Sequence, residues 1–100
     1  MNIQITSRKF RAKDSLKEFI EKELKTLEKY NDEILEANVV LSYTHTKDSI
    51  KNAEVNIIIP GKVLSITETS EEYSKSVTIA VGKLIRQLKK EKSKKISKVR

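Results

Sequence analysis

Basic side chains gather near the C-terminal end of the chain, with few acids to balance them. Nine of the 21 lysine and arginine residues lie within residues 83–100, where Glu91 is the only acid. The other 12 basic and 13 acidic residues nearly cancel, so the formal net charge of +7 comes from this end. Such asymmetry favours a polyanionic partner, with nucleic acid first and an anionic membrane second. The plain alternative is a solvated lysine tail that aids solubility.

The spacing of these cations indicates chemistry on one side of a helix. At about 100° per residue, positions i, i+3, i+7 and i+11 form one stripe, about 120° around from the middle of the apolar side. The stripe consists of Lys83, Arg86, Lys90 and Lys94. It should stay exposed while the helix is docked. Cations on a rigid helix can contact nucleic-acid phosphates at a low entropic cost, giving affinity and salt dependence but little sequence readout.

Catalytic and metal-binding patterns are absent from the sequence. There is no cysteine, and the single histidine, His45, has no acid pair at metal-ligand spacing. No glycine-rich phosphate loop or GxSxG motif occurs. Glu71 and Glu72 suit the start of a helix better than a catalytic pair. We therefore expect no enzyme, no cofactor and no metal.

Membrane binding is also disfavoured by the sequence. The N-terminus lacks the apolar run of a signal peptide, and no stretch approaches the roughly 20 apolar residues needed to cross a bilayer. The basic helix has no Trp, and its apolar side is needed to cover the sheet. We expect a soluble, cytoplasmic protein rather than a membrane-bound one.

Hydrophobic periodicity predicts the elements that position this stripe. Alternating residues predict strands over 1–6, 35–43, 53–59 and 62–69, with the facing of the last one ambiguous. Helical spacing predicts a helix from Asp14 to about Tyr30, capped by Asp14 or by a Ser15–Glu18 capping box, and another from Ser70 to beyond Lys90. Residues 7–13 should form a loop and 46–52 a turn. The loop carries Arg8, Lys9, Arg11 and Lys13.

This order predicts an α+β fold, β-α-β-β-β-α, with a four-stranded sheet and both helices packed on one face. Residues 1–92 should form a single α/β domain and residues 93–100 a frayed basic tail. Tyr30, Tyr43 and Tyr73 are expected to pack inward rather than stack on bases. The α-β-β-β-α part also has the architecture of double-stranded-RNA-binding domains, so a general double-stranded-RNA-binding module is the alternative function.

Taken together, several motifs resemble the ribosome hibernation-promoting factors and ribosome-associated translation inhibitors. The matching segments are spread along nearly the whole chain. The most specific is Glu71-x-Tyr73 followed by KLIRQLKKEK (83–92), although the family usually has Asp at the position of Glu71. The others are IQIT (3–6) with Arg8 after it, LEKY (27–30) and VVL (39–41).

The resemblance implies a protein that binds the 30S subunit and 70S ribosome during stationary phase or stress. The family's site is the channel between head and body, overlapping mRNA and the A- and P-site tRNAs. Binding there inhibits translation and stabilises idle ribosomes. The family's 16S rRNA-contacting positions match Lys83, Arg86 and Lys90, with Lys29 and Arg8 as helpers, and Lys92 and Lys94 continue the stripe.

The chain resembles the short members of that family. Because the given sequence stops at Arg100, we expect a short form, without the C-terminal domain that dimerises ribosomes in longer members and without the acidic tail of the inhibitor type. Short members favour ribosome dimers with the help of a separate ribosome-modulating factor, which is the further partner that the resemblance implies. Away from the ribosome we expect a monomer.

Overall fold

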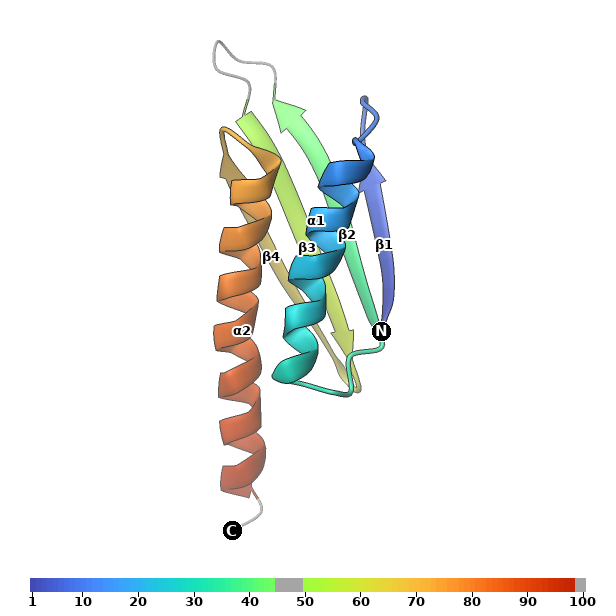
Figure 1. Ribbon diagram of the computed structural model, residues 1–100. Coiled ribbons are helices and arrows are strands. Elements are labelled where there is room, and N and C mark those ends of the chain that lie inside the picture. The colour runs from blue at the N-terminus through green and yellow to red at the C-terminus, as the bar shows by residue number, and fades with distance from the viewer. Residues whose placement is uncertain (45–49, 99–100) are drawn as a thin grey trace.

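The chain forms one sheet and two main helices in the predicted order (Figure 1). The computed structural model describes residues 1–44 and 50–98, and the side chains of 1–44 and 50–91. His45 and most of the predicted turn at 46–52 lie outside the described residues. The elements are β1 (Asn2–Ser7), α1 (Asp14–Lys25), a short 3₁₀ helix η1 (Thr26–Lys29), β2 (Glu36–Thr44), β3 (Ile50–Ile59), β4 (Lys62–Ser70) and α2 (Tyr73–Lys98).

The four strands lie in sequence order, β1-β2-β3-β4. β1 pairs parallel with β2 because α1 carries the chain back between them, whereas β2, β3 and β4 pair antiparallel. The register places Val39 opposite Ile5 on one side and Val55 on the other, and Val55 opposite Ile66. Apolar residues therefore form continuous rows across one face of the sheet.

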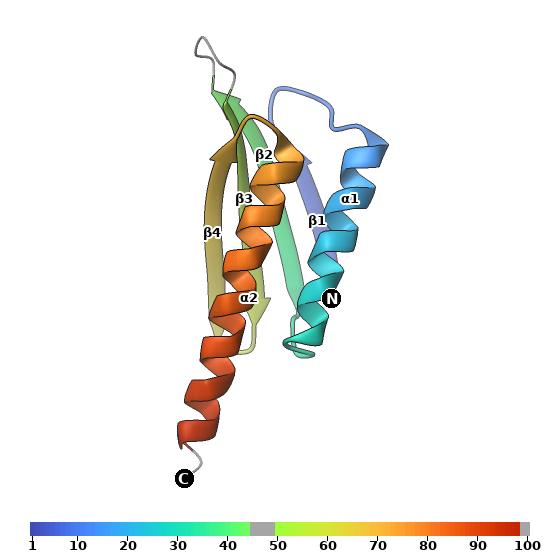
Figure 2. The same ribbon diagram turned by 60° about the vertical axis from the view of Figure 1, so that its left-hand side comes forward.

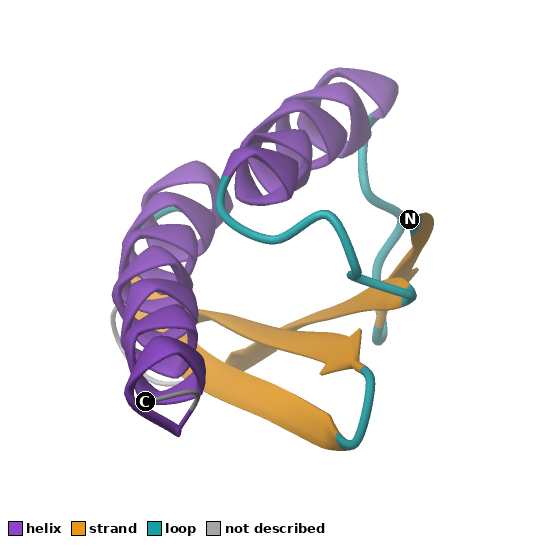
Figure 3. Cartoon of the chain, turned by 90° about the horizontal axis from the view of Figure 1, so that it is seen from below, coloured by secondary structure: helices purple, strands orange, loops and turns teal. Residues whose placement is uncertain are grey.

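Both helices cover that apolar face, as Figures 2 and 3 show. The predicted α+β class and the one-sided packing are confirmed. The core lies between the helices and the sheet. Its largest fully buried apolar side chains are Ile20, Leu24, Leu27, Val39, Leu41, Val55, Ile57, Val77, Leu84 and Leu88.

The facing of β4 is decided by its pairing with β3. Leu64 lies opposite Ile57, which is fully buried, so Leu64 turns to the helices and is only 5% exposed. The side chain of Val63, one residue earlier, points to the opposite face of the sheet and is 59% exposed. The turn before β4 is the Pro60-Gly61 pair, with Gly61 in the left-handed region at φ 77°.

The predicted cap and end of the first helix were wrong in detail. Lys13 is the N-cap residue and makes no side-chain capping bond, so Ser15 already lies in the first turn, where it cannot act as a cap. At the other end, the Thr26 hydroxyl donates to the Glu23 carbonyl at 2.6 Å. The last turn tightens into η1 instead of continuing as an α-helix to Tyr30.

The start of α2 is fixed by serine side chains rather than by acids in its first turn. The backbone N–H of Glu72 donates to the Ser70 hydroxyl at 3.2 Å, and the helix begins at Tyr73. Glu71 and Glu72 thus precede the first turn. Ser76 is completely buried, and its hydroxyl donates to the Lys51 carbonyl at 3.0 Å. This bond ties the beginning of α2 to β3.

Candidate nucleic-acid interface

The exposed side of α2 carries the predicted cationic stripe. Leu84 and Leu88 are buried against the core, 0% and 1% exposed. Arg86, which lies between them in the sequence, and Lys90, which follows Leu88, are exposed. This follows from the helical repeat, since residues two apart point in widely different directions. Figure 1 shows the C-terminal part of α2 extending beyond the sheet. Arg86 and Lys90 are therefore accessible to a large partner.

Lys83 differs from the other two, because an acid on the neighbouring strand partly neutralises it. Its Nζ lies 2.8 Å from Oε2 of Glu68 on β4. The Glu68 side chain is 19% exposed and the Lys83 side chain 49%. The sequence alone showed almost no acid near the stripe, because Glu68 is brought there by the packing of α2 on β4. Any phosphate contact by Lys83 competes with this ion pair.

The one acid within residues 83–100 is paired with a cation of the sheet. Glu91 forms a salt bridge to Lys62 of β4 at 2.5 Å. Among the residues whose side chains are described, no salt bridge reaches Arg86, Lys89 or Lys90. Within residues 83–91 of α2, whose side chains are described, Arg86, Lys89 and Lys90 are thus exposed cations without a salt bridge.

A second element adds a cation to this end of the molecule. η1 packs against α2, and the Lys89 ammonium lies 5.4 Å from the centroid of the Tyr30 ring, just after η1. Lys29, the last residue of η1, directly precedes Tyr30 in the chain and is exposed. We call Lys29, Lys83, Arg86 and Lys90 the helix surface. Lys92 and Lys94 lie on the α2 backbone, but their side chains are outside the described residues.

Arg8, the remaining predicted contact, does not lie with the helix surface. It directly follows β1, and its backbone N–H donates to the Leu41 carbonyl at 2.9 Å. This is the end of the sheet where α1 and α2 begin, opposite the C-terminus of α2 (Figure 1). The structure therefore separates Arg8 from the four residues of the helix surface.

The uncovered face of the sheet has the opposite character. Within the four strands as described, the residues on that face include no lysine or arginine, while Glu36 and Glu54 are both there. Its middle row is polar and consists of Gln4, Asn38, Asn56 and Ser65. Phosphate groups would be repelled from this face and attracted to the helix surface.

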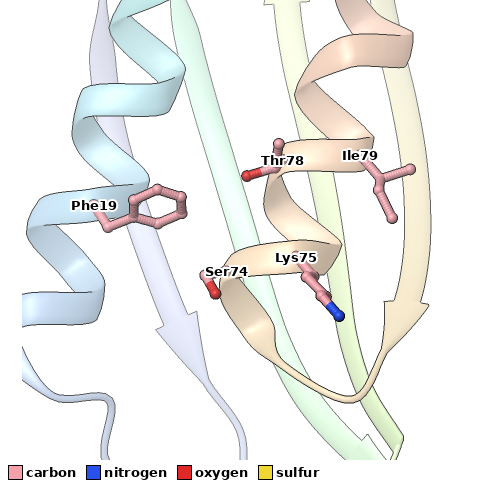
Figure 4. A pocket seen from close by; sticks show the side chains of 5 residues that line it. All are labelled: Phe19, Ser74, Lys75, Thr78 and Ile79. Carbon is pink, nitrogen blue, oxygen red and sulfur yellow. The ribbon is translucent and has the colours of Figure 1, made fainter.

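The hollow between the two helices offers no catalytic constellation. It is an open depression of about 340 Å³, lined by Phe19, Ser74, Lys75, Thr78 and Ile79 (Figure 4). These side chains include no acid and no histidine. In the described part of the chain, no three His, Cys, Asp or Glu side chains are grouped to hold a metal. Nor does any described helix combine the length and apolar character that crossing a bilayer requires.

Aromatic residues gather at the Arg8 end of the sheet, and sequence reasoning missed part of this cluster. The ring of Phe10 stacks on Tyr73 with centroids 5.0 Å apart and meets Tyr43 edge-on at 6.0 Å. The Tyr73 hydroxyl donates to the Ser42 carbonyl at 3.0 Å. Burial, with a smaller effect of nearby Tyr43, raises the pKa of Tyr73 above 10.0, so its phenol stays a neutral donor at neutral pH. Tyr43 and Tyr73 thus pack with Phe10, which no periodic pattern had singled out.

Two solved structures share this arrangement of strands and helices. The N-terminal domain of protein Y from Thermus thermophilus matches with a TM-score of 0.80 and 30% identity, covering 90% of this chain and 98% of that one. A ribosomal subunit interface protein from Coxiella burnetii matches with a TM-score of 0.82 and 28% identity, covering 93% and 99%.

Two curated relatives share the name ribosome hibernation promotion factor. The Bacillus subtilis protein is 28% identical over 94 residues, covering 94% of this chain and 50% of its own length. The Deinococcus radiodurans protein is 26% identical over 93 residues, covering 91% and 49%. The chain thus spans about half the length of these relatives.

A family model accounts for almost the whole chain. Residues 3–96 match the model described as Sigma 54 modulation protein / S30EA ribosomal protein. The match covers α1, β2, β3 and β4 in full and all but the outer ends of β1 and α2, and it agrees with the fold of the solved neighbours. The chain belongs to the Sigma 54 modulation protein / S30EA family of ribosome-associated proteins.

Proposed function

We propose that this chain is a ribosome hibernation factor that binds 16S rRNA of the 30S subunit and the 70S ribosome through its helix surface. It occupies the channel of mRNA and the A- and P-site tRNAs, so it inhibits translation and stabilises idle ribosomes. The observation that carries the proposal is the exposed pair Arg86 and Lys90, which has no salt-bridge partner among the described side chains. The names of its relatives support the ribosome as the source of the RNA.

The arrangement of Arg86 and Lys90 suits contact with the sugar–phosphate backbone of RNA rather than recognition of its bases. Arg86 and Lys90 are one helical turn apart, about 6 Å along the helix, and α2 is docked by buried Leu84 and Leu88. Their Cα atoms are already fixed, so binding orders only the side chains. Phosphate contacts of this kind depend strongly on salt and little on sequence. Recognition of RNA shape and charge, without recognition of bases, is sufficient for a site inside a ribosomal channel.

Co-sedimentation with ribosomal particles tests the proposal. The protein should migrate with 30S and 70S particles in a sucrose gradient and leave them as salt rises. Prebound P-site tRNA with mRNA should reduce binding of the protein, because the protein and these RNAs would occupy the same channel. Naked duplex RNA in equal nucleotide amounts should compete poorly. Equal competition by duplex RNA would instead identify a general double-stranded-RNA-binding module.

The ion pair between Lys83 and Glu68 predicts that one substitution should strengthen binding to the ribosome rather than weaken it. The substitution Glu68→Gln should strengthen binding to 30S particles by about two- to fivefold at low salt, because it frees Lys83 and removes a nearby negative charge. Titration of labelled protein with 30S particles measures the effect. Glu54→Gln on the uncovered face makes the same change in net charge and should leave affinity unaltered. An equal gain in both variants would show that Lys83 does not contact the RNA.

A further inference from the structure

The loop between β1 and α1 carries a second set of cations that the helix surface does not include. Its four basic residues are all exposed, and no described salt bridge involves any of them. No acid occurs before Asp14, so the loop has no neutralising residue of its own. We call this set the loop surface; it consists of Arg8, Lys9, Arg11 and Lys13.

The loop surface has a fixed backbone, because residues between and beside its cations are anchored. The Lys9 carbonyl accepts a hydrogen bond from the Tyr43 hydroxyl at 3.3 Å. Lys9 itself adopts the left-handed conformation at φ 64°, which non-glycine residues seldom do. Phe10 stacks on Tyr73, and Ala12 is only 5% exposed in the core. Inward anchors at 10 and 12 therefore alternate with outward cations at 9, 11 and 13.

A further cation lies against the aromatic rings that anchor the loop. The Lys51 ammonium is 5.7 Å from the centroid of Tyr43 and 5.6 Å from that of Tyr73. Cation–π contact of this kind holds an ammonium without neutralising its charge. The positive potential of the loop surface is thus reinforced from β3.

The loop surface and the helix surface lie too far apart to contact the same phosphate. Phe10 stacks on Tyr73, the first residue of α2. At about 1.5 Å per residue, Arg86 lies roughly 20 Å and Lys90 roughly 26 Å farther along the helix. Figures 1 and 2 show the β1–α1 connection at the end of the molecule away from the C-terminus.

We propose that the loop surface is a second RNA-binding site, which holds a segment of ribosomal RNA backbone separate from the one at the helix surface. This inference rests on the proposed function and names a second contact for it. RNA is favoured over an acidic protein segment because the loop offers four cations and no exposed large apolar residue. The described exposed large apolar residues, Leu35, Ile50, Val63 and Ile79, all lie elsewhere. Protein interfaces have an apolar core, whereas phosphate contacts do not need one.

A charge-matched pair of variants tests the loop surface. Arg11→Gln/Lys13→Gln removes two exposed loop cations, and Lys22→Gln/Lys25→Gln removes two exposed cations of α1. None of the four residues belongs to the helix surface. The loop variant should bind 30S particles about tenfold more weakly near physiological salt, and the slope of log affinity against log salt should fall by about 1 to 2. The α1 variant should keep the parent affinity and slope.

The outcomes separate this inference from the proposed function. If the parent protein does not bind 30S particles, the proposed function fails. If the parent binds and the loop variant behaves like the α1 variant, only the second site is overturned. Photo-crosslinkers placed at residues 11 and 86 then identify the partner. Crosslinks to two separate rRNA segments support the proposal, whereas crosslinks from residue 11 to protein alone, or to the nucleotides reached from residue 86, overturn it.

Discussion

Replacing three cations of the helix surface together, in the variant Lys83→Gln/Arg86→Gln/Lys90→Gln, is expected to weaken binding to 30S particles by about 100- to 1,000-fold near physiological salt. Each lost phosphate contact removes roughly 1 kcal/mol or somewhat more, and these three side chains share one exposed side of α2. The slope of log affinity against log salt should fall by about 2 to 3, because fewer counterions are released. Salt-dependent binding titrations measure both quantities.

A variant with the same loss of charge is available on the other helix. Lys17→Gln/Lys22→Gln/Lys25→Gln changes three lysines of α1, and glutamine has nearly the helix propensity of lysine. This variant should bind within about threefold of the parent if local contacts, rather than net charge, provide the affinity. The proposal for the helix surface would be refuted if the α2 variant kept the parent affinity and salt slope.

The three single substitutions should not contribute equally. Lys83 must leave Glu68, 2.8 Å away, before it can bind a phosphate, so part of its gain is offset. Arg86 and Lys90 have no such acid among the described side chains. The guanidinium of Arg86 can also bind phosphate oxygens with two hydrogen bonds. Arg86 should therefore show the largest single effect and Lys83 the smallest.

Most of the fold was predictable because its elements have clear hydrophobic periods. The alternation Ala37, Val39, Leu41 in β2 became one buried face of the sheet. The facing of β4 was not predictable, because Val63 and Leu64 are both apolar and only the pairing of Leu64 with Ile57 distinguishes them. Helix boundaries failed for a local reason: the Thr26 hydroxyl competes for the Glu23 carbonyl and tightens the end of α1.

The candidate site was predictable only where it lies on a single helix. Helical spacing converts sequence positions directly into directions, so Arg86 and Lys90 were placed on the exposed side of α2 correctly. The pairing of Lys83 with Glu68 joins two residues 15 positions apart and depends on how α2 docks on β4. Likewise, Phe10 gains its role from Tyr43 and Tyr73, which only the tertiary fold brings together. No sequence period encodes such contacts.

Docking of α2 is itself testable, because Leu84→Ala should lower the free energy of unfolding by about 2–5 kcal/mol. Leu84 is fully buried, so its truncation removes apolar burial and leaves a cavity. For a domain of 100 residues this corresponds to a fall in Tm of about 10–30 °C. Denaturant unfolding followed by circular dichroism measures the change.

Ile79→Ala is the matched control on the same helix. Ile79 is 42% exposed, so its truncation should cost less than about 1.5 kcal/mol. Where Leu84→Ala is still folded, its loosened α2 should also bind 30S particles more weakly, although every cation remains. Equal stability losses at the two positions would contradict the buried placement of Leu84. Leu84→Ala could instead lose stability as expected and still bind 30S particles with the parent affinity. That result would show that the cations need no firmly docked helix, so preorganisation would not contribute to the affinity of the helix surface.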